Sequence, residues 1–321
     1  MRGILRFGAL WAFGSGAACG NVSDKPDAAM PDAAIDAALP SPTLYRWIID
    51  KQQLPKSNPE AIMYGLDLNG DQVVDNQLGA VFAAFTAQGL DMQAASDTAI
   101  ARGTILMLAE ASVGGAVANA ATFTMYTGAN AQPPACSGPT DTVCRRHLQG
   151  TGSFDLAATS AHDPPLAGSI ANQTLIAGPG HLQVSLAFLG GTPRPLELIG
   201  ARVRLQPVAA NSLGQSVLAG AVPMAQIDTQ IYPAIQQSAS AQVAIDCTNM
   251  TPPACGCTAG SKGATYLSLF DTTPKDCKIT IDEVSNNTLL KSLFAPDVTI
   301  EGQQALSLGF GITAVKATFT P

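Results

Sequence analysis

Four oxygen-bearing side chains at regular spacing make one short segment of this sequence suited to binding a metal ion. They are Asp67, Asn69, Asp71 and Asp75. A chain that curls around one cation directs positions 1, 3 and 5 inward, and position 9 closes the far side directly or through water. Three carboxylates this close repel one another unless solvent or a cation separates their charges. The spacing therefore predicts a Ca²⁺ site, and the plain alternative is a polar turn rich in Asn, Asp and Gly.

Over about a dozen residues this segment resembles the calcium loops of EF-hand, dockerin and thrombospondin type 3 repeats. The resemblance implies that the main-chain carbonyl of Val73 occupies position 7. Two positions depart from the pattern, because Gln72 stands at position 6, where Gly is usual, and Leu78 at position 12, where a bidentate Glu is usual. The missing ligand would have to come from elsewhere in the chain.

A second acidic loop near the far end resembles the EF-hand order of an aromatic residue, an acidic loop, Ile, Thr and a closing Glu. Its candidate ligands are Asp271, Asp276, Thr280 and Glu283. Asp271 fits position 1 only if the loop carries one extra residue. One interpretation is that the loop still binds an ion, and the alternative is that turn hydrogen bonds and a disulfide at Cys277 hold its shape. A third fragment, Asp297 to Gly302, has oxygens at positions 1, 3 and 5 but no later ligand, and we expect a turn there.

Residues 1–19 have the features of an export signal: Arg2 and Arg6, an apolar stretch and then small residues before Cys19. A Cys directly after Gly-Ala-Ala resembles the lipobox of bacterial lipoproteins, which implies that Cys19 is lipidated and becomes the first mature residue. Gly16 departs from the usual Leu, so cleavage at a nearby Ala by an ordinary signal peptidase is the alternative.

Residues 20–42 are rich in Asp, Ala and Pro and cannot form a core, so we expect an extended, disordered tether. Such tethers after a lipobox resemble those of predicted lipoproteins from myxobacteria and related Gram-negative bacteria. The resemblance implies an outer-membrane or cell-surface location, with the periplasm or secretion as alternatives. No later segment offers about 18 uninterrupted apolar residues, so we expect membrane contact through the lipid alone.

Six cysteines remain once Cys19 is set aside, an even number that indicates disulfides in an oxidising compartment. Cys136 and Cys144 flank a short polar loop suited to one local bridge. The other four are expected to pair among themselves in an order that the sequence leaves open: Cys247, Cys255, Cys257 and Cys277. A zinc site made of these four thiolates is the competing interpretation.

The remaining residues 43–321 are enough for one large core or for smaller units at 43–115, 116–245 and 246–321. With 13% charged residues, 30 Gly and 22 Pro, the composition favours short strands joined by turns. We expect an α+β, mostly β-rich and sandwich-like domain. Strands are predicted at 44–49, 104–112, 122–126, 153–157, 182–189, 196–205, 217–221 and across 305–318, and helices at 76–88, 92–102, 224–244 with a kink at Pro233, and 286–294.

The net charge of −7 argues against nucleic acid as a partner. His147, His162 and His181 lie in no recognisable catalytic motif, and the sequence contains no GxSxG, HExxH or phosphate-binding glycine loop. We therefore expect a non-catalytic cell-envelope lipoprotein with structural Ca²⁺ and an unidentified protein or glycan partner. The alternative is an exported hydrolase that Ca²⁺ stabilises.

Overall fold

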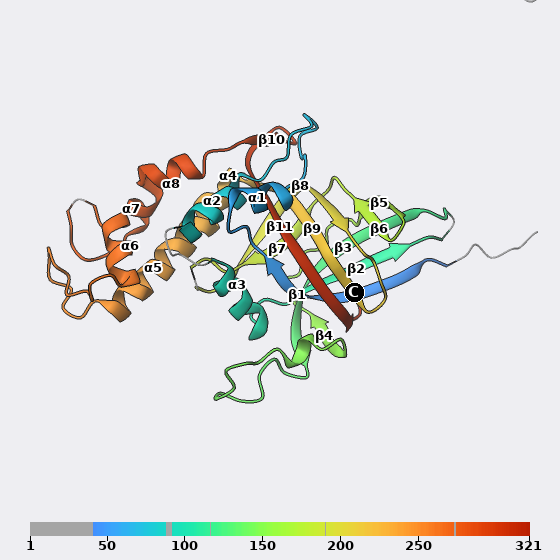
Figure 1. Cartoon of the computed structure of the whole chain (residues 1–321), viewed down its shortest axis with the longest axis horizontal. Helices are drawn as coiled ribbons and strands as arrows, with labels where there is room; N and C mark the ends of the chain where they lie inside the picture. The colour runs from blue at the N-terminus through green and yellow to red at the C-terminus, as the bar shows by residue number, and fades with distance from the viewer. Residues whose placement is uncertain (1–40, 88–91, 116, 190, 273) are drawn as a thin grey trace, which may run out of the picture. The chain divides into compact units, whose positions relative to one another are not determined.

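The computed structural model describes residues 41–87, 92–115, 117–189, 191–272 and 274–321 (Figure 1). The predicted export signal, Cys19 and nearly all of the tether lie outside these residues. The strands are β1 Thr43–Gln53, β2 Met107–Val113, β3 Ala120–Gln132, β4 Gly152–Leu156, β5 Leu166–Ala171, β6 Thr174–Ala177, β7 Leu182–Leu186, β8 Arg194–Leu205, β9 Ser212–Pro223, β10 Val298–Ile300 and β11 Gln303–Thr318. The helices are α1 Asn58–Met63, α2 Gln77–Ala87, α3 Met92–Ala101, α4 Met224–Gln226, α5 Tyr232–Asp246, α6 Lys262–Phe270, α7 Ile281–Asn286 and α8 Thr288–Leu293, with a 3₁₀ turn at Arg146–Leu148 and a π-helical turn at Ile227–Ile231.

Eight strands pair in sequence and the last returns to the first. The order is β1, β2, β3, β5, β6, β8, β9 and β11, every pair is antiparallel, and β11 then pairs with β1. We call this arrangement the closed sheet. The expected β-rich α+β fold is confirmed, and the pairings form one continuous sheet.

The inner face of the closed sheet is filled with apolar side chains. Residues paired across antiparallel strands share a face of the sheet. Trp47 of β1 is paired with Ala109 of β2, and Phe310 of β11 is paired with Leu218 of β9. All four are fully buried. The Trp47 indole Nε1 also donates a hydrogen bond to the carbonyl of Ala209, at 3.0 Å, in the turn between β8 and β9.

Helices cover the outer face of the closed sheet unevenly, as Figure 1 shows. α2 packs on β11 and α3 on β1. α3 reaches the end of β1, where Gln93 and Ser96 bind Gln52. Ile48 and Leu108, which are paired neighbours on β1 and β2, are also fully buried. On β6, by contrast, Ile176 is 58% exposed. One side of the sheet thus supports the loops and helices described below, and the other faces solvent.

The predicted helix at 224–244 is present but interrupted. The π-helical turn Ile227–Ile231 lies directly before α5, and Pro233 is in the first turn of α5. Proline has no N–H and clashes with the preceding turn, which explains why the irregular turn lies just before it. The helix predicted at 286–294 is present as α8, and a separate helix, α7, precedes it. Asn287 ends α7 and caps α8 by accepting a hydrogen bond from the Leu290 N–H at 3.1 Å.

Candidate functional site

The first acidic loop connects α1 to α2 and is drawn together at its base. Leu66 and Asp75 form an isolated β-bridge, with the Asp75 N–H donating to the Leu66 carbonyl at 3.1 Å. Within the loop, Gly70 and Gln72 have φ angles of 85° and 71°. Gln72 therefore adopts the left-handed conformation that favours Gly at this position of a calcium loop. The Gln at position 6 does not prevent the tight turn.

The acidic side chains of this loop receive hydrogen bonds from its own backbone. The Asp67 carboxylate accepts from the N–H groups of Gly70, at 2.6 Å, and Gln72, at 2.9 Å. The Asp71 carboxylate accepts from the N–H of Val73 at 2.7 Å. Among the described residues, no three side chains of His, Cys, Asp or Glu converge on a point that could hold a metal ion. The predicted donors thus share one tight loop, in which the Asp67 and Asp71 carboxylates are bound to backbone N–H groups.

Asp75 is the most buried of the predicted ligands, with 8% of its surface exposed. Its Oδ2 accepts a hydrogen bond from the Leu68 N–H at 2.8 Å. Burial raises the pKa of Asp75, and the negative charges of Asp297 and Asp71 raise it further. A carboxylate crowded by others in a low-dielectric position is stabilised by a nearby cation.

The third acidic fragment lies beside the first loop. Asp297 and Asn69 line the same hollow, of about 360 Å³. The Asp297 carboxylate is oriented by Ser307 of β11, whose N–H donates at 2.8 Å and whose hydroxyl also donates. We expected only a turn here, and Glu301 and Gly302 do make that turn, with φ angles of 53° and 76°. No local pattern indicated that Asp297 would lie next to this loop, from which it is distant in the sequence.

Asn76, directly after the loop, joins three elements. Its side-chain oxygen accepts hydrogen bonds from the N–H groups of Gly79, at 3.0 Å, and Gly309, at 2.7 Å. Its amide nitrogen donates to the carbonyls of Ala61, at 2.8 Å, and Gly309, at 2.9 Å. Asn76 is thus a cap for α2 and a link from the loop to α1 and β11. Sequence reasoning missed this role because three of the four bonds go to residues far from Asn76 in the sequence.

The second acidic loop is held by hydrogen bonds and a disulfide. The buried Asp271 carboxylate accepts from the N–H groups of Asp276, at 3.1 Å, and Cys277, at 3.0 Å. Glu283 accepts from the N–H groups of Thr280, at 2.9 Å, and Thr272, at 3.1 Å. Thr280 and Glu283 together form a capping box for α7. These contacts are those of the alternative in which turn hydrogen bonds and a bridge keep the loop in shape.

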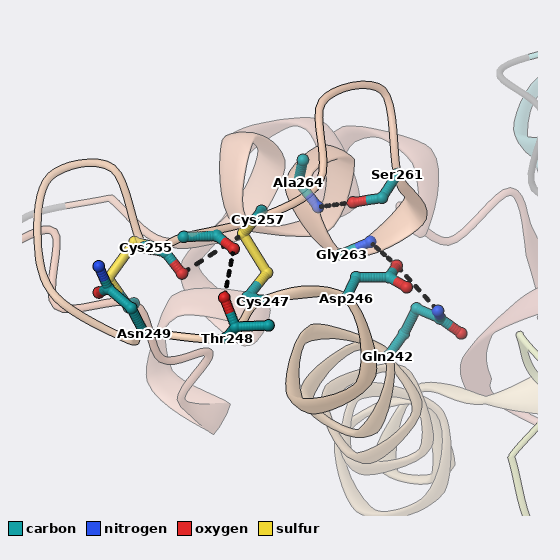
Figure 2. The surroundings of a disulfide bond; sticks show 12 residues. Gln242, Asp246, Cys247, Thr248, Asn249, Cys255, Cys257, Ser261, Gly263 and Ala264 are labelled. Carbon is teal, nitrogen blue, oxygen red and sulfur yellow. Dashed lines mark hydrogen bonds between the residues drawn. A yellow bond between two sulfur atoms is a disulfide. The ribbon is translucent and has the colours of Figure 1, made fainter.

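All six cysteines that the structure describes are paired in disulfides. The expected bridge Cys136–Cys144 is present, and the other two are Cys247–Cys257 and Cys255–Cys277. Figure 2 shows the cluster at the end of α5, where Asp246 also binds the start of α6. Because these cysteines are oxidised, they supply no thiolates, and the zinc alternative is wrong.

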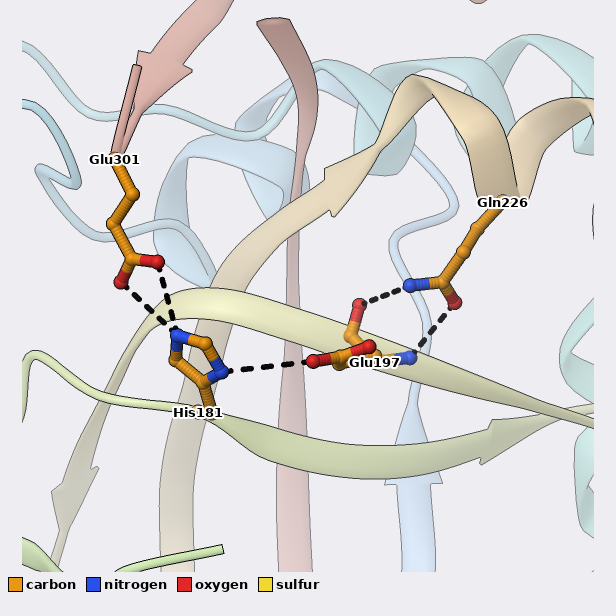
Figure 3. Close-up of polar contacts among 4 residues, drawn as sticks. All are labelled: His181, Glu197, Gln226 and Glu301. Atoms are coloured by element: carbon orange, nitrogen blue, oxygen red, sulfur yellow. Dashed lines mark hydrogen bonds and ion pairs between the residues drawn. The ribbon is translucent and has the colours of Figure 1, made fainter. Parts of the chain in front are cut away.

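His181 lies between two carboxylates on the surface (Figure 3). Its Nε2 is 3.0 Å from Glu301, and its Nδ1 is 3.5 Å from Glu197. Gln226 in turn exchanges two hydrogen bonds with the main chain of Glu197, at 2.9 and 3.2 Å. Both ring nitrogens of His181 thus contact a carboxylate. The cluster therefore connects β7, β8 and the β10–β11 turn.

His147 is fully buried and packs edge-on against Phe154, with ring centroids 6.3 Å apart. Burial, and then the charge of Arg145, lowers the pKa of His147. The unfolded chain, with a histidine pKa of about 6.5, therefore binds a proton at a higher pH than the folded protein. We expect the free energy of unfolding to be highest above about pH 6.5 and to fall as the pH drops toward the folded-state pKa.

Urea unfolding at pH 7.5 and pH 5.0 measures this effect. His147→Phe should reduce the difference in the free energy of unfolding between the two pH values. His162→Gln, at an exposed position, is the control and should leave the effect of His147 on that difference unchanged. An unaltered pH dependence in His147→Phe would show that His147 is not the group responsible.

Comparison with protein-family models, curated proteins and solved structures gave no match to this chain. Over the described ranges, none of the helices is long and apolar enough to cross a membrane. What the protein does is therefore inferred from its own residues.

Proposed function

We propose that this protein is a non-catalytic cell-envelope lipoprotein whose fold is stabilised by Ca²⁺ in the loop from Asp67 to Asp75. The observation that carries the proposal is the environment of Asp75. This buried carboxylate has a raised pKa and lies near Asp71 and Asp297, at the base of a loop that already makes the tight turn at Gln72. A cation there would offset the repulsion.

Asp67, Asn69, Asp71, the carbonyl of Val73 and Asp75 would hold the ion. Ca²⁺ takes six to eight oxygen ligands, so this set needs water or a further carboxylate to be complete. Asp297, which lines one hollow with Asn69 and another with Asp75, is the candidate for this carboxylate. The ion would act by binding the folded form only, joining the loop to the start of β10.

Thermal unfolding with and without Ca²⁺ tests the proposal. With a dissociation constant of about 10⁻⁴ M, typical of extracellular sites, 1 mM Ca²⁺ adds about 1.4 kcal/mol and raises the melting temperature by roughly 3–5 °C. Asp67→Ala combined with Asp71→Ala should abolish this rise. In chelator the same variant should melt close to the unaltered protein.

Asp282→Ala is the matched control, since it removes an exposed carboxylate from α7. It should retain the full Ca²⁺-dependent rise. The proposal fails if Ca²⁺ gives no saturable rise, if Mg²⁺ gives the same rise, or if the double variant is destabilised equally in Ca²⁺ and in chelator.

The envelope location rests on the residues before the described part of the chain. We propose that Cys19 is lipidated and that residues 20–42 act as a tether. An intact mass of the mature protein that corresponds to an unmodified N-terminus would contradict this proposal. The hydrolase alternative needs a general base, a histidine or a carboxylate, in a cleft, and no observation on the described residues favours it.

A further inference from the structure

A hollow of about 780 Å³ is lined by α3, by Leu189 and residues 191–193, and by Lys262 at the start of α6. This volume is within the range of about 300–1,000 Å³ that is usual for small-molecule sites. On one side the hollow is lined by α3, which packs on β1, and on the other by the start of α6, which packs on α5. It is separate from the acidic loops, and none of the predicted Ca²⁺ ligands lines it.

Part of the lining of this hollow is apolar. The apolar residues are Ala94, Ala95, Ala99, Leu189 and Pro193. The short side chains on α3 leave space that a longer residue would fill. Apolar surface of this kind gains about 25 cal/mol for each Å² that a ligand covers. This apolar part of the lining therefore favours a ligand with a hydrocarbon body.

The rim of the hollow is positively charged, although the chain as a whole has a net charge of −7. Arg102 and Lys262 both line it and are exposed, and no carboxylate is among the residues that line it. Thr98 and Thr104 also lie on the rim, and their hydroxyls donate to main-chain carbonyls at 2.8 and 3.0 Å. These hydroxyls are thus fixed in position, and the charge of the rim is complementary to an anion.

Lys262 is the first residue of α6, directly after the N-cap Ser261. Its charge acts on the carboxylate of Asp246, which also accepts from the Gly263 N–H, at 2.7 Å, and from the Gln242 amide, at 2.8 Å. Asp246 does not line the hollow, so the charges that line it are those of Arg102 and Lys262.

We propose that this hollow binds a small carboxylate with an apolar body, of the medium-chain fatty acid class. Arg102 and Lys262 hold the carboxylate group, since a guanidinium matches a carboxylate in a two-bond geometry. The alanines of α3, Leu189 and Pro193 cover the hydrocarbon chain. The proposal does not depend on Ca²⁺.

Isothermal titration calorimetry of the purified chain with decanoate tests this site. Decanol supplies the apolar body without the charge, and acetate supplies the charge without the body. We expect saturable binding of decanoate, and binding of decanol and acetate that is at least about tenfold weaker, because a charged hydrogen bond contributes about 1.5–3 kcal/mol. Equal affinity for decanoate and decanol, or no binding of decanoate, would overturn the proposal.

Three variants locate the ligand. Arg102→Gln and Lys262→Gln should each weaken decanoate binding by about tenfold, and Thr98→Trp should block it by filling the hollow. Arg204→Gln, which removes an exposed cation at a different hollow, is the matched control and should bind normally. A loss in Arg204→Gln equal to that in Arg102→Gln would contradict the site.

Two further measurements distinguish a loss of decanoate binding from misfolding of a variant and from an effect of Ca²⁺. Thermal melts of each variant identify any that fail to fold, and Lys262→Gln, at an exposed helix start, provides a second test if Thr98→Trp does not fold. Titration in Ca²⁺ and in chelator should give the same affinity for decanoate. Failure of the Ca²⁺ proposal therefore leaves this one intact, and the reverse also holds.

Discussion

Asn76→Ala should lower the free energy of unfolding by about 3–5 kcal/mol, one of the two largest effects that we expect from a single substitution. The change removes hydrogen-bond partners from both main-chain groups of Gly309, from the N–H of Gly79 and from the carbonyl of Ala61. A buried group left without a partner costs about 1–3 kcal/mol, and partial access of water to Asn76 keeps the total below the simple sum.

Urea unfolding at pH 7.5 measures this loss. Asn286→Ala is the matched control, because Asn286 is exposed and its side chain accepts one hydrogen bond, from Lys291 at 3.0 Å. The control should change stability by less than about 0.5 kcal/mol. If Asn76→Ala also lost less than about 0.5 kcal/mol, the hydrogen bonds of Asn76 to α1, α2 and β11 would contribute little to the free energy of unfolding.

Trp47→Ala should lower the free energy of unfolding by about 3–5 kcal/mol, the usual cost of removing a large aromatic side chain from a core. Trp47 is fully buried on the inner face of the closed sheet, stacks on Tyr45 with ring centroids 5.6 Å apart, and binds the carbonyl of Ala209. The alanine variant leaves a cavity and an unpaired carbonyl.

Two substitutions on the same strand calibrate this result. Trp47→Phe keeps most of the apolar volume and should lose less than half as much stability as Trp47→Ala. Leu44→Ala, at a position that is 52% exposed, should have a small effect. Chemical denaturation of the three variants gives the ranking, and a loss in Leu44→Ala equal to that in Trp47→Ala would contradict the position of Trp47 in the core.

The elements that sequence analysis located have strong local patterns. The strand predicted at 44–49 is β1, the helices at 76–88 and 92–102 are α2 and α3, and the strand at 196–205 is β8. In each of these segments the apolar residues recur at the period of the element. The export signal and tether were also predicted from local composition, and they lie outside the described residues.

The missed elements have weak or unusual local signals. β5 and β6 are short, and β5 contains Ala, Gly and Ser. The two residues that join them, Asn172 and Gln173, have φ angles of 49° and 59°. A turn with two positive φ angles usually contains Asn-Gly, so Asn-Gln gave no hairpin signal. α6 was also missed, although Ser261 accepts a hydrogen bond from the Ala264 N–H and a Ser at this position was a detectable N-cap signal.

The candidate site was predictable only where its residues are neighbours in the sequence. The spacing from Asp67 to Asp75 could be read directly, but the approach of Asp297 and the bonds of Asn76 to Gly309 depend on where β11 packs. Likewise, nothing local to His181 indicated Glu301, which is 120 residues away. Contacts of this kind follow from the order of the strands, which single-sequence patterns do not specify.

The pairing of β11 with β1 has a kinetic consequence. Trp47 pairs with Lys316, and the whole contact runs between residues 47–53 and 311–316. Contacts between residues so distant in the chain carry a large loop-closure entropy and slow the search for the native state. Until β11 arrives, β1 and β9 each expose an unpaired edge that can join a strand of another molecule. Refolding of this protein should therefore be slow and prone to aggregation at high concentration.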